Sequence, residues 1–165
     1  MKLIKNKNII LCVILIIVIS YIIFQNNFKI NHATNELNNN FPSTTLPIAQ
    51  FLNPITERIV KLPVEVPLEI DYGIGLSNRK QLSNRGMLFT FQNSNKHRGF
   101  SMKNTYIDLS IAFINAEKKI VSIKEMTALN QNIYTINMPF KYAIEAPKHW
   151  FTKNKIEIGY KVILP

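Results

Sequence analysis

The sequence has few of the residues that build metal, redox and phosphate-binding sites. It contains one cysteine in 165 residues, which excludes an internal disulfide and any zinc or iron–sulfur site made of several cysteines. Its five glycines leave little room for a glycine-rich phosphate loop. The length gives one ordinary domain and a little more, which excludes a two-domain dinucleotide-binding enzyme. Hydrophobic residues, at 47%, are nevertheless sufficient for a packed core.

Histidines and serines also lack the pattern of a reactive site. His32 lies in an asparagine-rich stretch, His97 lies in a polar stretch, and no cysteine lies near His149. No serine stands in a G-x-S-x-G motif, and no grouping of serine, histidine and aspartate is visible along the chain. We therefore expect no metal ion, no cofactor and no catalytic nucleophile.

The charge balance is basic, with 20 lysines and arginines against 10 acidic residues, a net charge of +10 and a pI near 9.8. Such a charge is compatible with a nucleic acid, an anionic membrane surface or a solvated surface. The basic residues are scattered singly rather than packed into one cluster. This scatter favours a solvated basic surface and no nucleic-acid partner.

The N-terminal residues have the pattern of a membrane-targeting segment. Lys2, Lys5 and Lys7 precede Ile9–Phe24, a run of sixteen residues without a charge. Each isoleucine, leucine, valine or phenylalanine in it favours the bilayer by about 0.3 to 0.6 kcal/mol. The side chains that follow are large, whereas cleavage of a signal peptide needs small ones. The pattern therefore favours an uncleaved signal anchor over a cleaved signal peptide.

Residues 1–28 are thus predicted to be a signal anchor or signal peptide, with the lipid bilayer as the partner of Ile9–Phe24. The preceding lysines place the N-terminus in the cytoplasm. The rest of the chain would then be extracytoplasmic, either on a single pass in a bacterial inner membrane or secreted after cleavage. Cys12 lies inside the run and is an ordinary apolar residue there.

Two further parts follow this segment. Residues 29–57 are rich in asparagine, threonine, serine and proline without a sustained period, which predicts a flexible tether. Residues 58–165 are predicted to form one compact α+β domain that is mostly β, strand-rich and barrel-like, with two short helices. Strand signals cover residues 58–67, 86–91, 100–107, 109–114, 119–126, 132–138, 140–145 and 160–164. Helix signals cover residues 68–82 and 147–153. The prolines in 58–67 place that strand near a sheet edge.

Three motifs follow one another between residues 75 and 145. Gly75-Leu76 precedes Gly-Met-Leu-Phe-Thr-Phe at 86–91, Phe-Ser-Met-Lys-Asn-Thr follows at 100–105, and Tyr-Ala-Ile-Glu follows at 142–145. In this order they resemble the domain of unknown function 192 family, which consists of small, often exported bacterial and archaeal proteins. The resemblance covers about residues 62–164. It implies a compact, strand-rich fold and brings no established reaction, substrate or cofactor.

The chain departs from this family at several positions. Ser101 stands where the family usually has tryptophan, and Ser110 and Tyr160 stand where it usually has aspartate. The carboxylates that the family usually provides at these two places are therefore missing here.

The middle motif supplies four candidate site residues. Met102, Lys103, Asn104 and Thr105 combine an apolar anchor, a cation, an amide and a hydroxyl. In a strand, Lys103 and Thr105 would share one face, and the motif could bind a small polar or anionic ligand. The alternative is a turn at a strand end, where Asn104 and Thr105 satisfy backbone groups.

Arg79 and Glu145 complete the candidate site. Arg79 is one of only four arginines, and we expect it to pair with Glu145 or Asp71. The apolar neighbours of Glu145 would raise the pKa of its carboxyl by burial unless it is paired.

These residues leave three functions open. The first is a non-enzymatic binding or accessory module of the bacterial envelope, whose cleft is lined by Arg79, Met102–Thr105 and Glu145. The second is an envelope hydrolase-type enzyme that uses Glu145 or Asp108 as its acid or base. The third is a structural partner for another envelope protein.

Overall fold

The structure is a computed structural model that describes residues 18–23, 25, 45–93 and 99–165. Residues 18–23 and 25 are helical, and the remainder of the apolar run Ile9–Phe24 lies outside the described residues. Within the part of the chain that is described, no helix has both the length and the apolar character needed to cross a membrane. Leu46–Pro165 form one compact unit, which is described by itself below.

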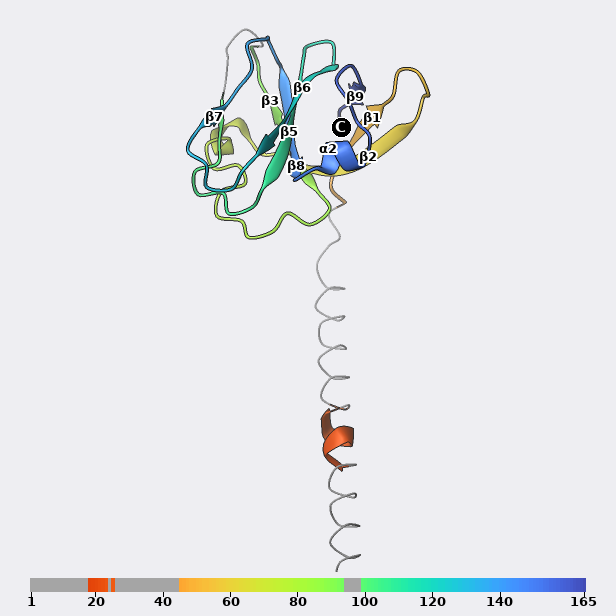
Figure 1. The fold of residues 1–165 in the computed structure, drawn as a ribbon, viewed down its shortest axis with the longest axis vertical. Coiled ribbons are helices and arrows are strands. Elements are labelled where there is room, and N and C mark those ends of the chain that lie inside the picture. The colour runs from red at the N-terminus through yellow and green to blue at the C-terminus, as the bar shows by residue number, and fades with distance from the viewer. Residues whose placement is uncertain (1–17, 24, 26–44, 94–98) are drawn as a thin grey trace, which may run out of the picture. The chain divides into compact units, whose positions relative to one another are not determined.

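The described residues of this unit form nine strands and two short helices (Figure 1). In chain order they are β1 (Ile48–Leu52), β2 (Ile59–Glu65), η1 (Glu69–Asp71), β3 (Gly86–Thr90), β4 (Phe100–Ser101), β5 (Leu109–Ile114), β6 (Ile120–Met126), β7 (Ile133–Tyr134), β8 (Tyr142–Pro147), α2 (Trp150–Lys153) and β9 (Lys161–Ile163). Seven strands form one sheet in the order β6-β5-β8-β3-β2-β1-β9, and β4 pairs with β7 beside it. Within the large sheet, β2 and β3 pair in parallel and the other neighbours pair antiparallel. The expected mostly-β domain with two short helices is confirmed.

The sheet is open and not closed into a barrel, which corrects the barrel-like expectation. Its end strands are β6 and β9. They meet at one isolated bridge between Lys119 and Lys161, supported by backbone hydrogen bonds such as that from the N–H of Ile120 to the carbonyl of Tyr160, at 3.0 Å. The sheet therefore curves enough to bring its ends together at a single point without forming a continuous ladder there.

Both faces of the sheet are covered, so its central strands are apolar on both sides. In β3, Leu88 packs into one cluster while Met87 and Phe89 pack into the other. The first, which we call the helix-side cluster, also contains Phe151 of α2. The second, the loop-side cluster, also contains Leu76, Leu82, Phe91, Phe100, Met102, Ile136 and Phe140 from the loops and short strands. This double burial explains why residues 86–91 and 109–114 read as continuous apolar runs.

The first strand lies in a segment that was expected to be part of the tether. β1 pairs with both β2 and β9, and the compact unit begins at Leu46 and not at residue 58. Ala49 and Phe51 are fully buried and alternate with less buried neighbours, as a strand with one covered face requires. A strand of five residues was too short for this alternation to stand out. Residues 29–44 lie outside the described residues.

The expected edge position of residues 58–67 is wrong, because β2 lies between β1 and β3. Its proline is still tolerated for a local reason. The N–H of Val64 donates to the carbonyl of Pro47 on the β1 side, at 2.8 Å, so the nitrogen of Pro63 faces the other side. There β3 pairs with Val64 and Glu65, beyond the proline, and no ladder hydrogen bond is lost.

Several expected elements are shorter than predicted. The strands expected over 100–107 and 132–138 shrink to the two-residue strands β4 and β7. The helix expected over 68–82 shrinks to η1 and a run of turns in which Gly75 and Asn78 have positive φ. The helix expected over 147–153 begins only at Trp150, because Pro147 is the last residue of β8.

Close packing at the start of β3 predicts a large effect of a single methyl group. In Gly86→Ala the new Cβ would collide with the carbonyl oxygen of Glu145 and lie 2.8 Å from Cδ2 of Leu62. We expect a loss of about 2 to 3 kcal/mol in the free energy of unfolding, measured by chemical denaturation. Gly73→Ala is the matched control, because its Cβ would meet nothing within 4 Å. Equal stability of the two variants would contradict this packing.

Candidate functional site

A pocket of about 410 Å³ opens beside the loop-side cluster. A volume of this size is typical of a site for a small molecule. Its wall is built from the loop at 72–77, from β3 and the residue after it, and from residues 99–101 around β4. Thr105, in the loop after β4, and Glu145 of β8 complete the wall. The lining residues are Tyr72, Gly73, Ile74, Gly75, Leu76, Ser77, Phe89, Phe91, Gly99, Phe100, Ser101, Thr105 and Glu145.

Glu145 is the one carboxylic acid among these lining residues. Its neighbours across the ladder are Met87 of β3 and Ile111 of β5, so its side chain emerges from the apolar, loop-side face of the sheet. The residue is 5% exposed, and its side chain has no hydrogen bond or ion pair with any residue that the structure describes. Because burial penalises the charged form, the pKa of Glu145 is raised to about 8.

Aromatic rings form the wall around this acid. Phe89 and Phe100 meet edge to face with ring centroids 5.2 Å apart, and Tyr72 packs on Phe89 in the same way, also at 5.2 Å. The hydroxyl of Tyr72 lies 2.8 Å from both the N–H and the carbonyl of Thr90, and so anchors the loop to β3. The pocket thus presents an aromatic wall, three hydroxyl side chains from Ser77, Ser101 and Thr105, and a single buried acid.

The structure places the middle motif in a turn and not in a strand. Met102 is buried in the loop-side cluster, Thr105 lines the pocket, and Lys103 and Asn104 are exposed. The N–H of Thr105 donates to the carbonyl of Met102 at 3.0 Å, and Asn104 has a positive φ of 61°. The alternative of a turn at a strand end is therefore correct, and the shared face expected for Lys103 and Thr105 is wrong.

The same turn holds two other loops through its backbone. The carbonyl of Asn104 accepts a hydrogen bond from the N–H of Asn78 at 2.7 Å, which ties down the loop that forms the pocket wall. The carbonyl of Thr105 accepts one from the N–H of Leu129 at 3.0 Å. Through these backbone hydrogen bonds the motif holds the loops around the pocket, and Thr105 is its one residue among the described lining residues.

Arg79 pairs with Glu65, and not with Glu145 or Asp71 as expected. Its two terminal nitrogens each lie 2.6 Å from a carboxylate oxygen of Glu65, which is the bidentate geometry. This hydrogen bond, with the attraction of the charge, raises the pKa of the Arg79 guanidinium. Glu65 opposes Met87 in the ladder and Met87 opposes Glu145, so the two acids lie on one face with a methionine between them.

Of the six predicted site residues, Thr105 and Glu145 therefore meet at the pocket. Arg79 lines a separate, shallower hollow with Glu65 and Asp71. The sequence interpretation missed the aromatic wall, because Phe89, Phe91 and Phe100 have the same pattern in the sequence as core residues. It also missed that residues 72–77 line a pocket, although Gly73 and Gly75 already indicated a short or irregular helix there.

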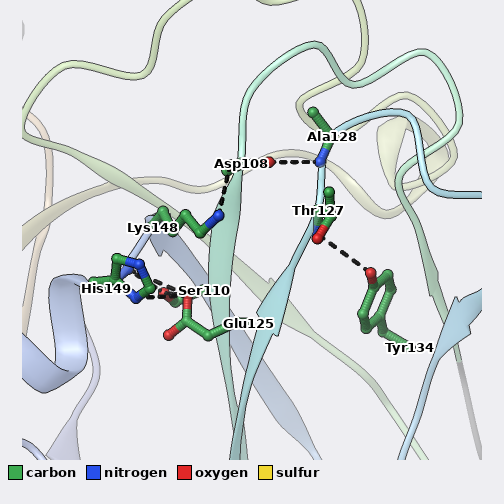
Figure 2. A network of polar contacts seen from close by, with 8 residues as sticks. All are labelled: Asp108, Ser110, Glu125, Thr127, Ala128, Tyr134, Lys148 and His149. Atoms are coloured by element: carbon green, nitrogen blue, oxygen red, sulfur yellow. Dashed lines mark hydrogen bonds and ion pairs between the residues drawn. The ribbon is translucent and has the colours of Figure 1, made fainter.

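A second polar cluster lies at the start of β5 (Figure 2). Asp108 accepts hydrogen bonds from the N–H of Ala128 at 2.8 Å and from the ammonium of Lys148 at 2.7 Å. The Ala128 N–H and then the Lys148 ammonium lower the pKa of Asp108. Asp108 is thus a paired, ionised group that ties the loop after β6 to the end of β8.

Ser110, Glu125 and His149 meet in the same cluster, although the sequence showed no such grouping (Figure 2). The hydroxyl of Ser110 donates to Glu125 at 2.8 Å and accepts from the backbone N–H of His149 at 2.7 Å, and the ring of His149 contacts Glu125 at 3.4 Å. A catalytic triad would place the histidine between the serine and the acid. Here the acid lies between them, and Ser110 is completely buried. The cluster is therefore a structural link between β5, β6 and the turn before α2.

The chain belongs to the domain of unknown function 192 family, described as an uncharacterized ACR, whose model matches residues 58–164. The resemblance predicted from the three motifs is confirmed. β1 lies ahead of the matched residues. No protein of curated function matches this chain.

Two solved structures are similar in fold. A protein from Sinorhizobium meliloti 1021, named as a candidate transcription regulator, is 23% identical, with a TM-score of 0.66 over 72% of this chain and 92% of its own. A protein of unknown function from Novosphingobium aromaticivorans is 21% identical, with a TM-score of 0.65 over 74% of this chain and 89% of its own. At this level of identity the likeness shows the fold alone.

The burial of Glu145 predicts how stability depends on pH. Its carboxyl has an ordinary pKa of 4.5 when unfolded and about 8 when folded, so the folded state holds more protons between these values. The free energy of unfolding should therefore fall as the pH rises from about 4.5 to 8, by on the order of 5 kcal/mol. In Glu145→Gln this fall should be absent, so the variant becomes the more stable protein at pH 8.

Urea denaturation across this pH range measures the effect. Glu157→Gln, which changes an exposed acid, is the control and should keep the fall. Parallel stability curves for the wild type and Glu145→Gln would contradict the conclusion that Glu145 is both buried and unpaired.

Proposed function

We propose that this protein is a non-enzymatic binding module for a small molecule, which enters the pocket lined by Tyr72–Ser77 and contacts Glu145. The observation that carries the proposal is the buried, unpartnered carboxyl of Glu145 at a pocket of suitable size. Burying a polar group without a hydrogen bond costs stability, typically several kcal/mol for a group that ionises. A ligand that hydrogen-bonds to Glu145 would offset this loss of stability.

Binding is favoured over the alternative of an envelope hydrolase. Hydrolases that use acid and base catalysis need two groups that face the same substrate. Among the described lining residues Glu145 has no second carboxylic acid beside it, and Asp108 is held by Ala128 and Lys148. Glu65, on the same face of the sheet, is neutralised by Arg79. A raised pKa alone suits a donor or acceptor of hydrogen bonds in a binding site as well as an acid catalyst.

The pocket chemistry also narrows the ligand expected from the sequence. An anionic ligand would need a cation, and neither lysine nor arginine is among the lining residues that the structure describes. Lys103, the cation expected to serve this purpose, is exposed and does not line the pocket. The proposed ligand is therefore polar without a negative charge at the end that meets Glu145.

We also propose that the module works at the outer side of a bacterial inner membrane, held there by its N-terminal segment. The support is the uncharged run Ile9–Phe24 with three lysines before it. An anchored module would act as an accessory protein that holds its ligand near the membrane.

Filling the pocket tests the proposed binding. Ser77→Trp would place a large side chain in the pocket lining, whereas Thr152→Trp adds the same bulk to an exposed position of α2. We expect compounds that raise the melting temperature of the wild type in a thermal-shift screen to do so for Thr152→Trp and not for Ser77→Trp. Compounds that stabilise both variants equally, or the absence of any stabilising compound, would contradict the proposal.

Fractionation of a bacterial host that produces the full chain tests the location. The protein should appear in the membrane fraction with residues 1–28 still present by mass measurement. Protease added outside intact spheroplasts should digest its compact domain. A protein that stays in the cytosol and is protected from the protease would overturn this part of the proposal.

A further inference from the structure

We infer that the pocket is selective for a protonated amine carried on an apolar or aromatic body, with the ammonium group bound between Glu145 and the aromatic wall. The inference rests on the proposed function and names the class of its ligand. Two features of the pocket carry it: the single unpartnered acid, and the rings that surround it.

The wall has the composition of a cation site. Tyr72, Phe89, Phe91 and Phe100 line the pocket, and their rings are fixed by edge-to-face contacts at 5.2 to 6.2 Å. Aromatic faces attract an ammonium group through the negative potential of the ring, and more strongly where water is excluded. They also cover the apolar body of a ligand at little entropic cost, because they are already ordered.

The acid supplies the charge that an ammonium group needs. Its ladder neighbours Met87 and Ile111 are apolar and give it no partner. Tyr72 is the other titratable group of the pocket lining, and its hydroxyl is already bonded to Thr90. In the neighbouring hollow, Arg79 is paired with Glu65, with Asp71 beside them. No cation among the described residues therefore competes with a ligand for Glu145.

Charge balance fixes the pH dependence of this binding. The free carboxyl is protonated below its pKa of about 8, and it must lose its proton to solvent before it can pair with an ammonium group. Well below pH 8 one proton is thus released for each amine bound, and well above pH 8 none is. The dissociation constant should fall about tenfold for each pH unit up to 8 and then level off while the amine, with a pKa near 10, keeps its charge.

Three matched probes test the inference on the full-length chain in phosphatidylcholine nanodiscs. They are 4-fluorophenethylamine, the neutral 4-fluorophenylethanol and the anionic 4-fluorophenylacetate, followed by ligand-observed fluorine NMR from pH 6 to 9. Empty nanodiscs correct for partition into lipid. We expect the amine to bind with the rising affinity described above, the alcohol to bind more weakly, and the acid not to bind.

Two variants assign the effect to the acid. Glu145→Gln should weaken amine binding at least tenfold and abolish its pH dependence, whereas Glu157→Gln should change neither. If the alcohol binds at least as tightly as the amine, or if amine affinity does not rise with pH, the amine inference is overturned while the proposed binding function stands. If no probe binds, the inference is likewise overturned, and the comparison of Ser77→Trp with Thr152→Trp decides the proposed function separately.

Discussion

The carboxyl group of Glu145 is fixed in an apolar face of the sheet because its strand is bonded on both sides. β8 pairs with β5 along its whole length and with β3 from Tyr142 to Glu145, so Glu145 cannot turn toward water without breaking two ladders. Gly86 adds to this constraint, since the backbone of Glu145 occupies the space where a larger residue would place its Cβ. The rest of the candidate site is arranged around this fixed acid: aromatic rings form part of the pocket wall, and the loop at 72–77 leaves the pocket open beside them.

The loops around the pocket depend on one short turn. Residues 102–105 anchor themselves in the loop-side cluster through Met102 and offer two carbonyls to neighbouring loops, those of Asn104 and Thr105. This explains why a motif that mixes polar and charged residues contributes little charge to the pocket itself. Its backbone hydrogen bonds join neighbouring loops and hold the 72–77 part of the pocket wall, which has no regular secondary structure.

Much of the fold could be predicted from the sequence, because strands buried on both faces leave long apolar runs such as 86–91 and 109–114. The family resemblance and the burial of Glu145 were also readable there. Other features depend on contacts that are distant in sequence. β1 is defined by its pairing with β2 and β9. The partner of Arg79 is set by how the turns after η1 fold back on β2, so Glu65 replaced the expected acids. The Ser110–Glu125–His149 cluster unites three segments that no local pattern connects.

The position of β9 has a consequence for how the chain reaches its native state. β9 lies against β1, and its Lys161 also bridges Lys119 just before β6. Until β9 is in place, β1 lacks one of its two neighbours and Phe51 lacks part of its cover. Closure of the sheet therefore depends on contacts between segments that are distant in sequence, which form slowly, and a chain without β9 in place remains loosely assembled.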